Sequence, residues 1–140
     1  MLVIKPIENK MKQKEMVTVC GGTYKETALA YAAYDCEDDG ETVRFPIGVC
    51  QFSLAGTKGV IDTLRTCPGV ADEEAMMIMA RACTSFLHRC GFPEATILPD
   101  GADDGLAAKL GFTVAEDGTA WLDVNKYYTG PCRGEEMVNQ

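Results

Sequence analysis

Residues 63–77 read TLRTCPGVADEEAMM, a strand-like run followed by a Cys-Pro-Gly turn and the start of a long apolar segment. A strand that leads through a glycine-containing loop into a helix often binds an anion, because N–H groups at the helix start are free to donate. Three carboxylates stand here, at Asp72, Glu73 and Glu74. The order of elements therefore favours a phosphate site, whereas the charge opposes it.

The segment from Asp72 to Cys90 is predicted to be the main helix. It has acids in its first turn, Arg89 in its last turn and Gly91 at the position of a C-terminal cap. The apolar residues recur at helical spacing on one face, which is expected to be buried: Met76, Met79, Ala80, Cys83, Phe86, Leu87 and Cys90. The opposite face carries Glu74, Arg81, Thr84, Ser85 and His88. Met77 and Ile78 extend the apolar surface, so another element, a ligand or a partner should cover that end.

The rest of the chain predicts one α+β domain over residues 1–140. We expect a strand at 2–7 and a helix at 8–19, then an antiparallel meander of three strands over about 27–67, with Pro46 at a strand start or a bulge. A strand at 94–99, a short helix at 103–110 and a hairpin at 112–124 follow, and a partly flexible tail spans about 125–140. Such an order predicts a mostly antiparallel sheet with one parallel crossover through the main helix.

Composition and charge exclude several classes of partner and site. The net charge of −8 opposes binding to nucleic acid or to anionic membranes, and no apolar run is long enough to span a bilayer. The first residues do not resemble a signal peptide, so a cytoplasmic protein is expected. The seven cysteines include no C-x-x-C pair and the only histidine is His88, which predicts reduced, mostly buried thiols and no metal site.

Several segments, taken in order, resemble the GNAT superfamily of acyl-CoA-dependent N-acyltransferases, as a small, divergent, bacterial-type member. They are KGVIDTLRT as a fourth strand, DEEAMMIMARACTSFLHRCGF as a central helix, EATILP as a fifth strand and GLAAKLGFTVAEDG as a short helix entering the last hairpin. The Ala-x-x-x-Gly-Phe join, from Ala107 to Phe112, is similar to the ending of that short helix in the family. The resemblance implies a twisted, mixed sheet of about six or seven strands flanked by about three helices.

The resemblance also implies acetyl-CoA as cofactor, with its pyrophosphate on a loop of the form Q/R-x-x-G-x-G/A and its pantetheine arm along the fourth strand. In this chain Gly69 and Ala71 match the second half of the loop, Thr66 stands where the family has Gln or Arg, and Arg65 lies one residue early. The cofactor-binding residues implied are Leu64, Arg65, Thr66, Gly69, Val70 and Ala71.

For the catalytic base, the resemblance implies a carboxylate near the fourth and fifth strands, which makes Asp62 and Asp100 the candidates. Asp62 stands inside a strand, where aspartate is uncommon and needs a partner if buried, whereas Asp100 is also typical of a turn. Ala107 occupies the position where many members have the tyrosine that protonates the departing thiolate. Tyr127 and Tyr128 are predicted to be packing residues.

Three functions remain open on the sequence. The first is transfer of an acyl group, which the resemblance implies to be acetyl, from CoA to a primary amine of a small molecule or peptide. The second is a non-catalytic GNAT-like binding domain or homodimer with a degenerate CoA loop, as the acids and Ala107 suggest. The third, a cysteine-based redox or metal protein, rests on the number of cysteines alone.

Overall fold

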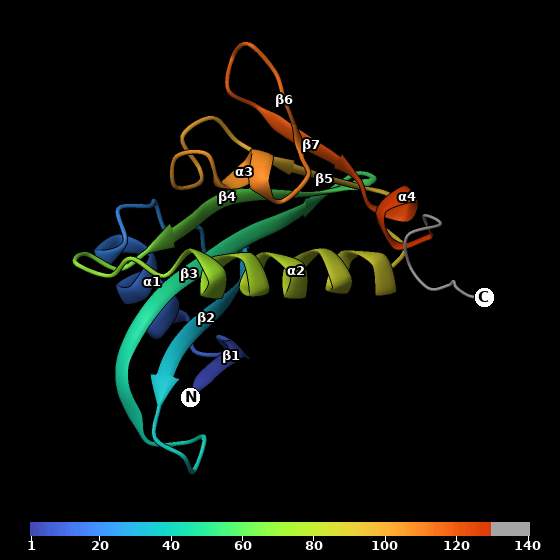
Figure 1. Ribbon diagram of the computed structural model, residues 1–140. Coiled ribbons are helices and arrows are strands. Elements are labelled where there is room, and N and C mark those ends of the chain that lie inside the picture. Colours follow the sequence, from blue (N-terminus) through green and yellow to red (C-terminus); the bar gives the residue numbers. More distant parts are fainter. Residues whose placement is uncertain (130–140) are drawn as a thin grey trace.

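The computed structural model describes residues 1–129, which form a twisted seven-stranded sheet with α1 on one face and α2 on the other (Figure 1). The strands lie in the order β1-β2-β3-β4-β5-β7-β6, and only the β4–β5 pair is parallel. The main helix α2 connects these two strands. The predicted α+β class, the meander and the parallel crossover are therefore confirmed.

The strands are β1 (Leu2–Pro6), β2 (Leu29–Cys36), β3 (Val43–Ala55), β4 (Lys58–Thr66), β5 (Glu94–Ile97), β6 (Thr113–Val114) and β7 (Ala120–Asp123). The helices are α1 (Lys10–Val19), α2 (Glu73–Arg89), α3 (Leu106–Lys109) and α4 (Val124–Thr129). The fourth helix lies in the segment that the sequence assigned to the start of a tail. The last part of that tail, residues 130–140 with Cys132, lies outside the described residues, as does its predicted flexibility.

Three register shifts interrupt the meander, two between β2 and β3 and one between β3 and β4. Pro46 lies at the β2–β3 shift between Ala33 and Tyr34, as the sequence predicted for a residue that cannot donate to the ladder. At the β3–β4 shift, Gln51 is opposite Thr63 and Phe52 is opposite Ile61, so Asp62 on β4 has no residue opposite it. This β3–β4 bulge places Asp62 at an irregular point in the centre of the sheet.

Helix α2 begins and ends where the sequence predicts. Asp72 is the N-cap, and its Oδ1 accepts a hydrogen bond from the N–H of Ala75 at 3.0 Å, while Gly91 has a φ of +82° beyond the last turn. The predicted buried face is confirmed for most of its residues, but Phe86 is only half-buried and Cys90 is exposed. Met77 is half-buried against the core, and Ile78 remains 40% exposed.

The prediction that Thr84 lies on the exposed face of α2 is wrong. Helix α4 covers it, and the Thr84 and Tyr128 hydroxyl oxygens are 2.9 Å apart. The Tyr128 ring also stacks on His88, with 4.8 Å between the ring centroids. A short terminal helix thus buries part of the polar face, and Tyr128 packs as expected.

Helix α3 starts later than predicted, at Leu106 rather than Asp103. Gly105 has a φ of +75°, which a right-handed helix does not allow, and the N–H of Asp103 is hydrogen-bonded to the carbonyl of Leu64 on β4. Residues 98–105 are therefore a loop that lies against β4. None of the helices in residues 1–129 is long and apolar enough to cross a membrane.

Neighbouring residues of α2 provide a test of this core. Met79 is fully buried, so Met79→Ala should lower the free energy of unfolding by about 2–5 kcal/mol. The matched control Ile78→Ala, one position along the exposed side, should cost about 1 kcal/mol or less. Urea denaturation followed by circular dichroism measures both, and equal losses would contradict the placement of α2.

Candidate functional site

Asp62 lies where strands β4 and β5 separate. The parallel ladder runs from Lys58 opposite Glu94 to Ile61 opposite Ile97, and the N–H of Leu98 donates to the carbonyl of Ile61 at 3.0 Å. Asp62 is the next residue on β4 and is also the extra residue of the bulge. The bulge and the divergence of the two strands thus coincide at one carboxylate.

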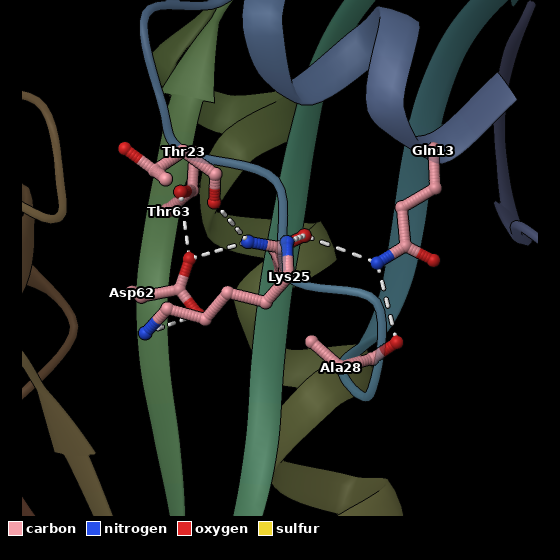
Figure 2. Close-up of polar contacts among 7 residues, drawn as sticks. Gln13, Thr23, Lys25, Ala28, Asp62 and Thr63 are labelled. Carbon is pink, nitrogen blue, oxygen red and sulfur yellow. Dashed lines mark hydrogen bonds and ion pairs between the residues drawn. The ribbon is translucent and has the colours of Figure 1, made fainter. Parts of the chain in front are cut away.

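The Asp62 carboxylate is nearly buried, with 7% of its side chain exposed. Its Oδ1 accepts hydrogen bonds from Gln51 Nε2 at 2.7 Å and from Thr63 Oγ1 at 2.9 Å (Figure 2). Its Oδ2 accepts no hydrogen bond within the described part of the chain, and the ammonium of Lys25 lies 3.8 Å from it. One carboxylate oxygen is therefore held by two hydrogen bonds, whereas the other is paired at longer distance with the Lys25 side chain, which is 45% exposed.

A buried amide network holds Asp62 in place from the α1 side of the sheet. Gln51 Nε2 also donates to the carbonyl of Thr23 at 2.8 Å, and Gln51 Oε1 accepts from Gln13 Nε2 at 3.0 Å and from the N–H of Lys25 at 3.2 Å (Figure 2). Gln13 and Gln51 are both fully buried. The sequence analysis missed these residues, although Gln51 interrupts the apolar run of β3 and was a detectable signal.

The N-terminus of α2 borders a cavity of about 380 Å³. Its lining residues are Thr66, Val70, Ala71, Asp72, Glu73, Met76, Asp103 and Leu106, and they include three acids and no base. Each acid has a partner in the chain. Asp72 caps α2, Glu73 pairs with Lys109 at 2.9 Å, and Asp103 Oδ2 accepts from the N–H of Thr66 at 3.2 Å.

Beyond Asp62, the edge of β4 that β5 has left is occupied by the chain itself. The N–H of Leu64 donates to the carbonyl of Gly101 at 2.6 Å, and its carbonyl accepts from the N–H of Asp103 at 3.3 Å. Gly101 is in close contact, since a Cβ there would lie 3.0 Å from the carbonyl oxygen of Asp62. Residues 101–103 therefore continue the sheet where β5 ends.

Several solved structures share the overall fold of this chain over most of their length. A GNAT family N-acetyltransferase from Escherichia coli in complex with CoA has a TM-score of 0.65 at 12% identity, covering 92% of this chain and 85% of its own. The PaiA N-acetyltransferase of Thermoplasma acidophilum, in complex with coenzyme A, gives 0.62 at 12% identity, covering 86% and 99%. The ribosomal-protein-S18-alanine N-acetyltransferase of Escherichia coli gives 0.62 at 10% identity, covering 89% and 94%.

The chain has the GNAT fold. No family model matches its sequence, and no curated protein matches it in sequence. The fold predicted from the order of elements is confirmed, whereas activity, donor and acceptor remain matters for a proposal.

Several of the residues that the GNAT resemblance assigned to acyl-CoA are already engaged within the chain or lie beside carboxylates. The peptide groups of Leu64 and the N–H of Thr66 are already hydrogen-bonded to residues 101–103. Val70 and Ala71 line the cavity, but the other lining groups that carry charge are carboxylates. Gly69 has a φ of +80° in the turn, and the Arg65 guanidinium donates to the carbonyl of Asp100.

The two predicted carboxylates are in different situations. Asp100 is exposed in the turn after β5 with a φ of 62°, a conformation typical of a turn aspartate. Asp62 is nearly buried, with one oxygen that accepts no hydrogen bond in residues 1–129. Ala107 packs against the core and provides no hydroxyl. Asp62 is therefore the stronger candidate for a functional carboxylate.

The support of Asp62 by Gln51 can be tested by a double-mutant cycle. Gln51→Leu removes the donor to Asp62 and to Thr23, and should lower the free energy of unfolding by about 2–4 kcal/mol. Asp62→Asn should cost less in the Gln51→Leu background than in the wild type, because it removes a charge that Gln51 no longer stabilises. Urea denaturation gives all four values, and strict additivity would contradict the coupling.

Proposed function

We propose that this protein is a GNAT-fold binding domain that does not use acyl-CoA. The observation that carries the proposal is the pairing of Leu64 with Gly101 and Asp103, at 2.6 and 3.3 Å. A cofactor arm along β4 would need these same peptide groups. Because a buried N–H or C=O rarely stays unpaired, the chain's own segment and a cofactor compete for one set of hydrogen bonds.

The charge at the start of α2 supports the same proposal. Asp72, Glu73 and Asp103 line the cavity where a GNAT pyrophosphate loop belongs. A phosphate beside a carboxylate meets a repulsion of about 1–4 kcal/mol per close pair at surface-like dielectric. A ligand that carries an amine, such as a small cationic molecule or a basic peptide, suits this lining and the net charge of −8 better.

No tyrosine is among the residues that line this cavity. Ala107 has no hydroxyl, and Tyr128 contacts Thr84, which is eleven residues beyond Glu73 and so about 16 Å along the helix. Tyr128 is thus placed to hold α4 against α2.

A second candidate function is N-acyl transfer, with acetyl-CoA as the donor, to a primary amine of a small molecule or peptide. It is favoured by Asp62, whose buried Oδ2 accepts no hydrogen bond in the described part and faces the ammonium of Lys25 at 3.8 Å. Such a carboxylate can take a proton from an ammonium directly or through water. This function requires residues 101–103 to leave β4.

Calorimetric titration with acetyl-CoA and with CoA at millimolar concentration separates the two functions. We expect no saturable heat with the full chain, because β4 is occupied and the cavity is acidic. Saturable binding would contradict the proposed function. Acetyl transfer to polyamines, amino acids or peptides that Asp62→Asn abolishes would establish the second candidate instead.

A matched variant shows which feature prevents binding. Asp72→Asn with Glu73→Gln removes two charges while an N-cap side chain is retained, so α2 should remain folded. If the occupied strand is the barrier, this double variant also fails to bind acetyl-CoA. Binding by the variant alone would show that charge, rather than residues 101–103, excludes the cofactor.

A further inference from the structure

Two cysteines that are distant in sequence meet beside the loop that precedes α2. Cys20 is the C-cap residue of α1, and Cys67 is the first residue after β4. The Cys20 Sγ donates a hydrogen bond to the Cys67 Sγ, and the two sulfurs are 3.4 Å apart. Both are free thiols. They are one point of contact between α1 and the β4–α2 loop.

We propose that Cys20 and Cys67 form an oxidation site, in which peroxide joins them in a disulfide that ties the end of α1 to the start of the β4–α2 loop. The S–S bond of a disulfide is about 2.05 Å long, so the sulfurs must approach by about 1.4 Å. Side-chain rotation with a small backbone shift provides a movement of that size. The proposal does not depend on whether the GNAT cleft binds a cofactor.

The surroundings of the pair allow a small oxidant to reach it. Cys20 is 7% and Cys67 is 6% exposed. Each precedes a turn with an open glycine, since a Cβ at Gly21 or Gly69 would meet nothing within 4 Å. A second pair, Cys50 and Cys83, is fully buried and is therefore the natural comparison.

The hydrogen bond between the two thiols sets the order of the steps. The Cys20 Sγ is the donor, and burial together with this hydrogen bond raises the pKa of Cys20 to about 12. The Cys67 Sγ is the acceptor, so the attack on peroxide is assigned to Cys67. In the second pair, the hydrogen bond to Cys50 and burial raise the pKa of Cys83 well above its ordinary value. That pair should react more slowly.

The chemistry balances with hydrogen peroxide as oxidant. The Cys67 sulfur attacks one peroxide oxygen, the O–O bond breaks, and a sulfenic acid forms while one water is released. The Cys20 sulfur then displaces the sulfenic oxygen as it loses its proton, the S–S bond forms, and a second water leaves. Two thiols lose two electrons and two protons, and one peroxide is reduced to two waters.

The tryptic map of the chain is suited to the test. Cleavage after lysine and arginine places Cys20 in peptide 15–25, Cys36 in 26–44, Cys50 in 45–58, Cys67 in 66–81, Cys83 in 82–89 and Cys90 in 90–109. The reduced full chain is exposed to graded hydrogen peroxide, alkylated with iodoacetamide, digested and analysed by mass spectrometry. A disulfide joins two peptides with a mass about 2 Da below their sum, for two hydrogens lost.

We expect peptides 15–25 and 66–81 to be joined at peroxide concentrations that leave Cys50 and Cys83 open to alkylation after denaturation. Cys20→Ser should leave a sulfenic acid on Cys67 that dimedone labels, and the control Cys90→Ser should leave the cross-link unchanged. Alkylation of both Cys20 and Cys67 after peroxide, or a cross-link of either to a third cysteine, would overturn the proposal. The wild-type map decides the matter even if a serine variant does not fold.

Discussion

The hydrogen bonding of strand β4 is the constraint on which the rest of the structure depends. One edge of β4 is paired with β3 from Lys58 to Thr66 except at Asp62, and the other is paired first with β5 and then, at Leu64, with residues 101–103. A strand in the middle of a sheet cannot leave its peptide groups unpaired without a large cost. The bulge at Asp62 marks the change from one partner to the next. Residues 101–103 of the loop after β5 thus form part of the sheet.

At the start of α2, the side-chain charges that stabilise the helix oppose the binding of an anionic ligand. Asp72 caps the helix, and Glu73 and Glu74 lie in its first turn, where each carboxylate favours the helix by about 0.3–1 kcal/mol. The helix N-terminus is also the part of a GNAT scaffold that is suited to a phosphate. In this chain the partial positive charge is offset by the protein's own side chains. The Glu73–Lys109 pair further joins this turn to α3.

Local patterns were sufficient to predict most of the fold. The spacing of apolar residues and the capping residues gave α2 to within one residue at each end, and Asp-Gly or Gly turns gave the meander. Contacts between distant segments were not visible in such patterns. Thr84 is buried because α4 returns to cover it, and Asp62 is supported by Gln51, which is eleven positions earlier in the chain. Asp62 could be recognised from the sequence as a candidate functional residue, whereas the hydrogen bonds that hold it through Gln51 could not.

The occupant of the β4 edge illustrates why the site was harder to predict than the fold. The sequence of residues 98–105, LPDGADDG, was consistent with a helix beginning at Asp103, and in isolation an aspartate there is a good cap. In the structure Asp103 uses its N–H for Leu64 and its carboxylate for Thr66, so these groups are engaged by β4. Glycine is needed at position 101, where a Cβ would lie 2.9 Å from the carbonyl oxygen of Leu98. Residues 101–103 therefore pair with the free edge of β4 instead of adding a turn to α3. This pairing shortens the helix and occupies the edge of β4.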